Sequence, residues 1–65
     1  MAQTIDRARM LRLPAVLELT GLSRSGIYRM VDAGEFPKPA KLGERVIAWP
    51  DREVHDWLDA RLAER

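Results

Sequence analysis

The stretch that decides the fold covers residues 14–34 and reads PAVLELTGLSRSGIYRMVDAG. Pro14 suits the first turn of a helix, where its missing N–H costs nothing, and Gly21 suits the left-handed residue that ends one. Ser23 is a favoured N-cap, so a second helix is predicted over residues 24–33, with Gly34 ending it. Two short helices joined by a tight turn that contains glycine predict a helix-turn-helix.

Two further stretches read as short strands. Residues 10–13 alternate apolar and polar side chains, which is typical of a strand. Residues 40–49 read as a hairpin in which Gly43 and Glu44 fit a type II′ turn, while a longer loop that includes Arg45 also remains open. A hairpin that follows the second helix is the layout of a wing.

A last helix is predicted to follow the hairpin. Asp51 is a favoured N-cap, and Glu53 falls in the first turn, where negative charge is stabilising. The fold class is therefore mainly α with a small β-hairpin: a winged helix-turn-helix of three helices plus a wing over residues 10–65, preceded by a flexible segment over residues 1–9. The apolar residues at helix and strand spacing predict a core of Leu13, Val16, Leu17, Leu22, Ile27, Met30, Val31, Ile47, Trp49, Val54, Trp57 and Leu58.

Composition excludes several classes of protein. The 65 residues include no cysteine and one histidine, His55, which is predicted on the solvent side of the last helix. No apolar run approaches the roughly 20 residues of a membrane span, and no phosphate-binding loop, dinucleotide turn or nucleophile elbow is present. We therefore expect a cytoplasmic protein that is not an enzyme and that needs no cofactor, metal or membrane.

The formal net charge is only +1, but the charges are unevenly distributed. Residues 1–12 hold three arginines against one acid, and residues 36–50 hold three basic residues against one acid. Residues 51–65 hold three arginines against five acids. This pattern fits a protein with one face for a polyanion, although an ordinary solvated surface would also explain it.

The predicted second helix has the most informative surface. With Ile27 at the centre of the buried face, Ser25 and Arg29 fall on the opposite side. The exposed N-terminal part then carries Ser23, Arg24, Ser25, Tyr28 and Arg29, with no acid among them. A helix N-terminus attracts phosphate, and arginine pairs with guanine in the major groove, so this face is suited to DNA. Alternatively, these residues are only solvated, and Tyr28 packs against the edge of the core.

The hairpin region is also basic, with Lys38, Lys41 and Arg45. These side chains fit non-specific attraction to phosphate or insertion of a basic tip into the minor groove. The alternative is a hairpin that is charged only to prevent edge-to-edge aggregation. Glu53, Asp56 and Asp59 lie three residues apart on the last helix, and we interpret them as a solvated face rather than a metal site.

Several short segments spread over residues 10–63 together match the pattern of one known family. They are residues 11–14 (LRLP), 20–25 (TGLSRS), 27–29 (IYR), 34–39 (GEFPKP), 42–43 (LG), Trp49, residues 53–54 (EV) and residues 57–58 (WL). In this combination the chain resembles the AlpA family of prophage regulatory proteins, whose fold is related to excisionases and to the MerR-type DNA-binding domain.

The resemblance implies a transcriptional regulator that binds DNA, often to control the integrase or excision functions of an integrated element. It places the recognition residues at Arg24, Ser25, Tyr28 and Arg29 and the wing at residues 41–45. Gly26 departs from the family, in which many relatives have threonine or another side chain. Glycine inside a helix costs about 1 kcal/mol relative to alanine and removes one contact, so the target sequence of a relative does not transfer.

Three functions fit the sequence. The first is a sequence-specific regulator that binds double-stranded DNA, and the second is an excisionase-like architectural factor that bends DNA for a recombinase. The third is a protein–protein adaptor that uses the helix-turn-helix as a scaffold. We expect the acidic last helix to contact any protein partner, such as RNA polymerase or a recombinase, and a weak homodimer on DNA would increase affinity.

Overall fold

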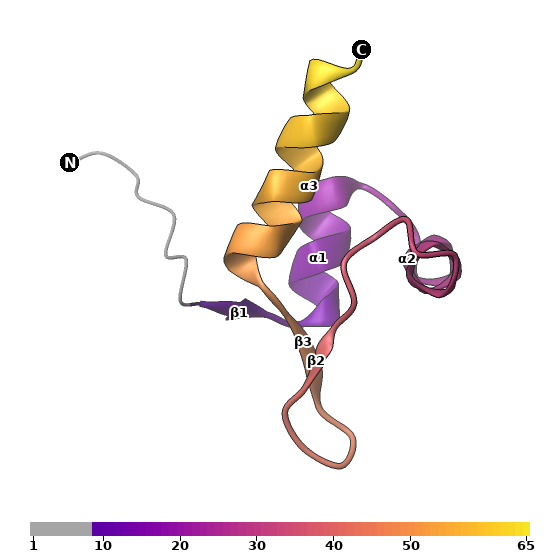
Figure 1. Ribbon diagram of the computed structural model, residues 1–65. Coiled ribbons are helices and arrows are strands. Elements are labelled where there is room, and N and C mark those ends of the chain that lie inside the picture. Colours follow the sequence, from indigo (N-terminus) through magenta and orange to yellow (C-terminus); the bar gives the residue numbers. More distant parts are fainter. Residues whose placement is uncertain (1–8) are drawn as a thin grey trace, which may run out of the picture.

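The computed structural model describes residues 9–65, which form three helices and three short strands (Figure 1). The prediction of a flexible segment over residues 1–9 falls, up to Ala8, outside the described residues. Along the chain the elements are β1 (Met10–Leu11), α1 (Leu13–Thr20), α2 (Arg24–Asp32), β2 (Ala40–Lys41), β3 (Ile47–Pro50) and α3 (Asp51–Ala63). The mainly helical architecture with a small antiparallel sheet confirms the predicted winged helix-turn-helix.

The turn between α1 and α2 forms as its residues predict. Gly21 has a φ of 73°, and its N–H donates to the Leu17 carbonyl at 2.8 Å, which ends α1. The Ser23 hydroxyl accepts a hydrogen bond from the Gly26 N–H at 3.1 Å and caps α2. Both helix ends are thus set by local chemistry, and this fixes where the exposed side chains of α2 begin.

The C-terminal end of α2 lies one residue before the predicted boundary, because Ala33 is the C-cap. Gly34 follows with a φ of 74°, its N–H donates to the Val31 carbonyl, and the Glu35 N–H donates to the Met30 carbonyl. This pair of hydrogen bonds is a Schellman motif, and it turns the chain away from α2 toward the wing.

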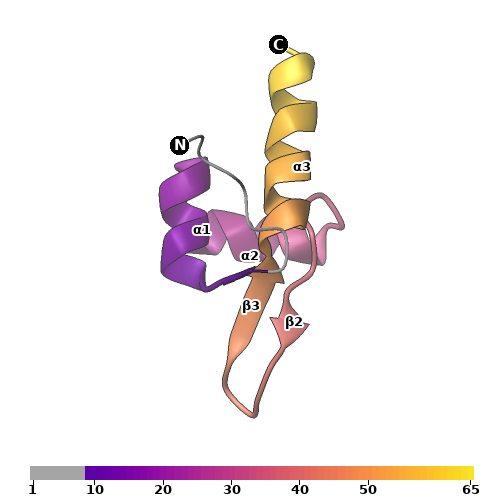
Figure 2. The same cartoon turned by 90° about the vertical axis from the view of Figure 1, so that its left-hand side faces the viewer.

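The three strands form one antiparallel sheet in the order β1-β3-β2. Leu11 pairs with Trp49, and Lys41 pairs with Ile47. The pairing of β1 with β3 was not predicted, since it joins segments almost 40 residues apart in sequence. It ties the start of α1 to the base of the wing, as the ribbon also shows (Figure 2).

The hairpin turn differs from the type II′ turn that Gly43 and Glu44 suggested. The N–H groups of Leu42 and Gly43 both donate to the Val46 carbonyl, at 2.7 and 3.2 Å, so residues 43–45 form a longer loop. A type II′ turn needs a positive φ at its first central residue, and only Gly21 and Gly34 have one among the described glycines. The two-residue turn was therefore wrong, and the longer loop through Arg45 is confirmed.

The core lies between the sheet and the three helices. Five of the predicted core residues are buried, and the remaining seven are half-buried and pack against them. The prediction missed three buried residues, Leu11, Phe36 and Ala48. Phe36 makes edge-to-face contacts with both tryptophans, with ring centroids 6.4 Å from Trp49 and 4.8 Å from Trp57.

Both indole groups also hold the segment that connects α2 to the wing. The Trp49 N–H donates to the Pro37 carbonyl, and the Trp57 N–H donates to the Glu35 carbonyl, each at 2.8 Å. These bonds satisfy carbonyls in a stretch where two prolines prevent regular structure. The wing is thereby fixed relative to both β3 and α3.

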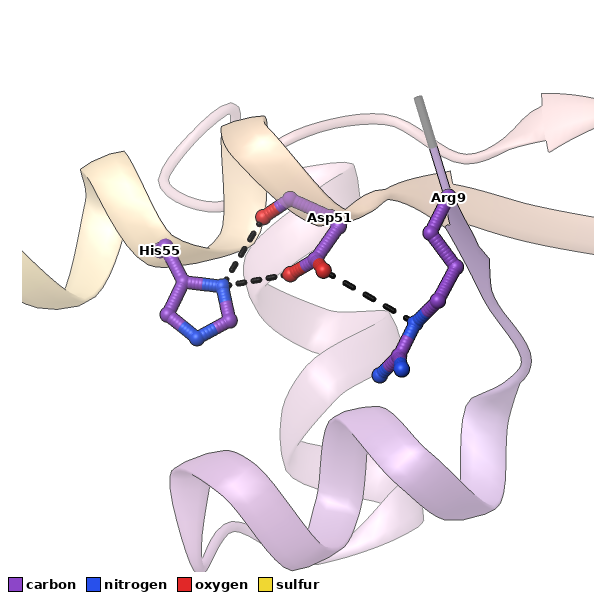
Figure 3. A network of polar contacts seen from close by, with 3 residues as sticks. All are labelled: Arg9, Asp51 and His55. Atoms are coloured by element: carbon purple, nitrogen blue, oxygen red, sulfur yellow. Dashed lines mark hydrogen bonds and ion pairs between the residues drawn. The ribbon is translucent and has the colours of Figure 1, made fainter. Parts of the chain in front are cut away.

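The predictions for Asp51 and His55 were wrong. Pro50, with a φ of −60° and a ψ of 131°, is the N-cap of α3, so Asp51 lies inside the first turn and its side chain caps nothing. The Asp51 carboxylate is buried instead, 2.5 Å from His55 Nδ1 and 3.8 Å from Arg9 Nε (Figure 3). Within residues 9–65, the buried Asp51 Oδ1 has no partner that meets hydrogen-bond geometry.

His55 is therefore half-buried against the first turn of its own helix rather than directed into solvent. The Asp51 N–H also donates to the Arg9 carbonyl at 2.9 Å, which continues the contact between β1 and the end of β3. The cluster of Arg9, Asp51 and His55 is a structural link between β1 and α3 (Figure 3).

Within residues 9–65, no helix has the length and apolar character needed to cross a membrane.

Candidate nucleic-acid interface

The N-terminal half of α2 presents polar and basic side chains to solvent. Ser23, Arg24, Ser25, Tyr28 and Arg29 are all exposed, while Ile27, on the opposite side of the helix, is completely buried. The predicted division of α2 into a buried and an exposed face is therefore correct. The exposed face carries two arginines and no acid before Asp32, the last residue of the helix.

Tyr28 is only partly exposed to solvent. The residue is 39% exposed, which leaves part of the ring against the protein and the rest accessible to a ligand. Such a position lets the ring pack while the hydroxyl donates or accepts a hydrogen bond outside the protein.

The basic residues of the wing region are exposed as well. Lys38 lies in the segment before β2, Lys41 lies on β2, and Arg45 lies in the loop at the tip of the hairpin. In both ribbon views this loop extends beyond the N-terminal end of α1, at the opposite end of the molecule from the C-terminus of α3 (Figures 1 and 2).

An open groove of about 240 Å³ joins α2 to the wing. Arg24 and Tyr28 line it from α2, one helical turn apart, and Arg45 lines it from the wing. Arg12, the N-cap of α1, completes the polar lining. The other lining residues are apolar: Leu13, Pro14 and Ile47.

Arg12 was not among the residues predicted for the site. A helical wheel of α2 and the charge of the hairpin give no information about which other elements approach them. The only available signal was the position of Arg12 directly before the first turn of α1, in the basic N-terminal part of the chain.

The groove is electropositive because three arginines line it and, among residues 9–65, no acidic side chain does. The described carboxylates form no ion pair with Arg12, Arg24 or Arg45; those that are seen join Asp51 to Arg9 and His55. The arrangement is suited to an anion, with guanidinium groups that can each make two hydrogen bonds to phosphate oxygens.

The structure thus brings Arg24, Tyr28 and Arg45 together and leaves the other predicted site residues outside the groove. Ser25 and Arg29 lie on the exposed face of α2, and the Ser23 hydroxyl caps that helix. Lys38 and Lys41 are exposed on the wing side without lining the groove.

Gly26 has a packing reason to be glycine. A Cβ atom at this position would lie 3.1 Å from the Ser23 hydroxyl, closer than ordinary van der Waals contact. A residue with a Cβ atom requires the Ser23 hydroxyl to shift by a few tenths of an ångström.

Residues 9–62 match the family model described as "Prophage CP4-57 regulatory protein (AlpA)". The chain belongs to the AlpA family. The match covers every described helix and strand apart from the last residue of α3, which confirms the resemblance inferred from the short sequence segments.

The chain is similar to relatives from a phage and from a bacterium. It is similar to the uncharacterized protein ORF88 of Enterobacteria phage P4, with 46% identity over 61 residues that cover 94% of this chain and 69% of the relative. It is also similar to the DNA-binding transcriptional activator AlpA of Escherichia coli (strain K12), with 37% identity over 59 residues that cover 82% of this chain and 84% of the relative.

Proposed function

We propose that this chain is a sequence-specific DNA-binding transcriptional regulator of a prophage or another integrated element. In this proposal the helix at residues 24–33 reads the major groove, and the hairpin at residues 40–49 contacts phosphates or the minor groove. One observation carries the proposal: Arg24 and Tyr28 of α2 line the same groove as Arg45 of the wing. This shared lining supports joint contact of the helix and the wing with one DNA duplex.

The exposed residues divide between two kinds of contact. Ser25 and Arg29 point away from the core and are the candidates for contacts with base edges, where arginine recognises guanine through two acceptors. Ser23, Tyr28, Lys38, Lys41 and Arg45 are candidates for contacts with phosphate, which position the helix but carry no sequence information. Arg24, in the first turn of α2, is a candidate for contact with either base edges or phosphates.

The relatives support the proposal without defining its details. The Escherichia coli relative is described as a DNA-binding transcriptional activator, and the match to it extends over most of both chains. Regulation of transcription in a bacterium would place this chain in the cytoplasm. The target sequence of a relative does not transfer to this chain, because Gly26 supplies no side chain for a contact in the first turn of α2.

The experiment that tests the proposal is selection of bound sequences from random duplex DNA. A regulator enriches one motif, and the enriched duplex then competes better than a scrambled duplex of the same composition. Failure to enrich any motif, with no preference for duplex DNA over heparin, contradicts the proposal. A gel mobility assay, in which the site is placed at different positions in a DNA fragment, measures DNA bending and distinguishes the regulator from the architectural factor. A strong bend indicates the excisionase-like architectural factor.

A module of this size reads few bases, so useful affinity requires tandem sites, a second copy or a partner protein. We propose that the partner, RNA polymerase or a recombinase, contacts the C-terminal half of α3, which stands clear of the body of the protein (Figure 1). Asp59 and Leu62 are exposed there. Replacement of Asp59 and Leu62 by alanine should reduce transcriptional activation in a reporter assay while DNA affinity stays unchanged; loss of DNA affinity would contradict this assignment.

A further inference from the structure

The groove between α1, α2 and the wing suggests a role for a residue outside the helix-turn-helix face. We propose that Arg12, Arg24 and Arg45 together clamp a single phosphate group of the DNA backbone. This inference rests on the proposed function and extends it, because it assigns Arg12 to the interface and assigns three arginines to one phosphate instead of three separate ones.

The geometry of the groove points to this ligand. Three arginines reach it from three elements that are far apart in sequence: the start of α1, the start of α2 and the loop of the wing. The volume of about 240 Å³ is below the usual range of pockets for drug-sized ligands, and the groove is open to solvent. An open, shallow, basic groove accommodates a short piece of phosphodiester backbone that passes across it.

The charges in the groove favour an anion strongly. Within residues 9–65, no carboxylate forms an ion pair with these arginines, so their positive charges remain available to an anionic ligand. Binding a phosphate releases counterions and pairs the guanidinium groups with phosphate oxygens.

The protein backbone holds all three arginines in place. Arg12 directly follows the β1–β3 pair Leu11 and Trp49, and its carbonyl accepts the N–H groups of Ala15 and Val16 at 3.0 and 3.1 Å. Arg24 follows the Ser23 cap, and Arg45 lies in a loop closed by two hydrogen bonds to Val46. The backbone positions from which the three side chains extend are therefore fixed, whereas the exposed guanidinium groups become ordered when the ligand binds.

The test is a scan of neutral methylphosphonate linkages along the selected duplex, with one substitution in each duplex. Wild-type protein should lose roughly tenfold in affinity at the clamped phosphate, as expected for a charge-assisted contact. Arg12→Gln should bind the unmodified duplex roughly tenfold more weakly and lose less than wild type when that one phosphate is neutralised, because only Arg24 and Arg45 still contact it. Arg12→Lys keeps the positive charge but cannot make two parallel hydrogen bonds, so its affinity for the unmodified duplex should lie between those of wild type and Arg12→Gln.

Arg65→Gln is the matched control, because it removes the same charge from the exposed C-terminal end of the chain, far from the wing (Figure 1). It should bind the unmodified duplex as tightly as wild type and show the same methylphosphonate profile. If Arg12→Gln behaves like Arg65→Gln, or if Arg12, Arg24 and Arg45 respond to three different phosphates, the clamp is contradicted.

A second measurement separates backbone phosphate from free anion. Titration of the protein with inorganic phosphate, followed by NMR, should shift the signals of Arg12, Arg24 and Arg45 together only at millimolar concentrations, because one free anion gains none of the other contacts of the duplex. Saturation at micromolar phosphate would instead indicate a site for a small anionic ligand and overturn the assignment to DNA. If no duplex is bound at all, the proposed function fails; if the duplex is bound but Arg12→Gln has no effect, only the clamp fails.

Discussion

The indole N–H of Trp57 donates a hydrogen bond to the carbonyl of Glu35, across 2.8 Å, and so connects α3 to the chain just after α2. Glu35 itself follows Gly34, whose left-handed conformation turns the chain out of α2. The guanidinium of Arg61 covers the other part of the indole, 4.8 Å from the ring centroid. This contact determines the direction in which the chain leaves the candidate recognition helix.

Trp57→Phe tests the contribution of that bond to stability. The variant keeps an aromatic ring against Phe36 but loses the N–H, so the free energy of unfolding should fall by about 1 kcal/mol. Trp49→Phe should cost at least twice as much, because Trp49 is fully buried and also loses volume. Urea titrations followed by circular dichroism give both free energies of unfolding. Equal losses would contradict the larger contribution expected of the more deeply buried Trp49.

Gly21→Ala tests the left-handed end of α1. The added Cβ would meet no atom within 4 Å, so the cost comes from the φ of 73° alone and should be about 1–2 kcal/mol. Gly43→Ala is the control, since its φ is not positive and its Cβ would make only an ordinary contact with Val46, 3.6 Å away. A thermal melt should show a lower midpoint for Gly21→Ala and little change for Gly43→Ala; the reverse order would refute the assignment.

Asp51→Ala tests the buried cluster at the start of α3. The variant leaves His55 and Arg9 without the carboxylate and removes a negative charge from the first turn of the helix. We expect a loss of about 1–2 kcal/mol in the free energy of unfolding, most of it from the buried contact, because Arg9 is exposed and its pair is worth little. Asp59→Ala, at an exposed position of the same helix, should change stability by less than about 0.5 kcal/mol.

The parts of the fold that depend on neighbouring residues were predictable from the sequence. Gly21, Ser23 and Gly34 set helix ends through their own conformations and through bonds within a few residues, so their roles follow from residue type. The exposed face of α2 followed from helical periodicity with Ile27 buried. These predictions needed no information about the rest of the chain.

The parts that depend on distant residues were not predictable. The pairing of Leu11 with Trp49 joins two ends of the fold, and Phe36 lies in a stretch between glycine and prolines that reads as a loop. Asp51 looked like a helix cap because of its residue type, whereas Pro50 already supplies the cap geometry. Arg12 joins the groove only because the sheet brings the start of α1 close to the wing.

Lys41→Ala tests the non-specific part of the proposed interface. With about five phosphate contacts, the logarithm of the association constant should fall with the logarithm of salt concentration with a slope near −4 to −5. Removing Lys41, which is exposed on β2, should reduce the magnitude of that slope by about 1 and weaken the selected and scrambled duplexes equally. Binding that does not respond to salt, or a loss confined to the selected duplex, would show that Lys41 does not contact phosphate.

The most direct measurement is the affinity of Arg29→Ala for the selected duplex and for duplexes with each base changed in turn. Arg29 lies on the exposed face of α2 opposite buried Ile27, so we expect a loss of about 1–3 kcal/mol and a relaxed preference at one position. Arg65→Ala should match wild type in both respects. Unchanged affinity and base preference in Arg29→Ala would mean that this face of α2 does not read DNA.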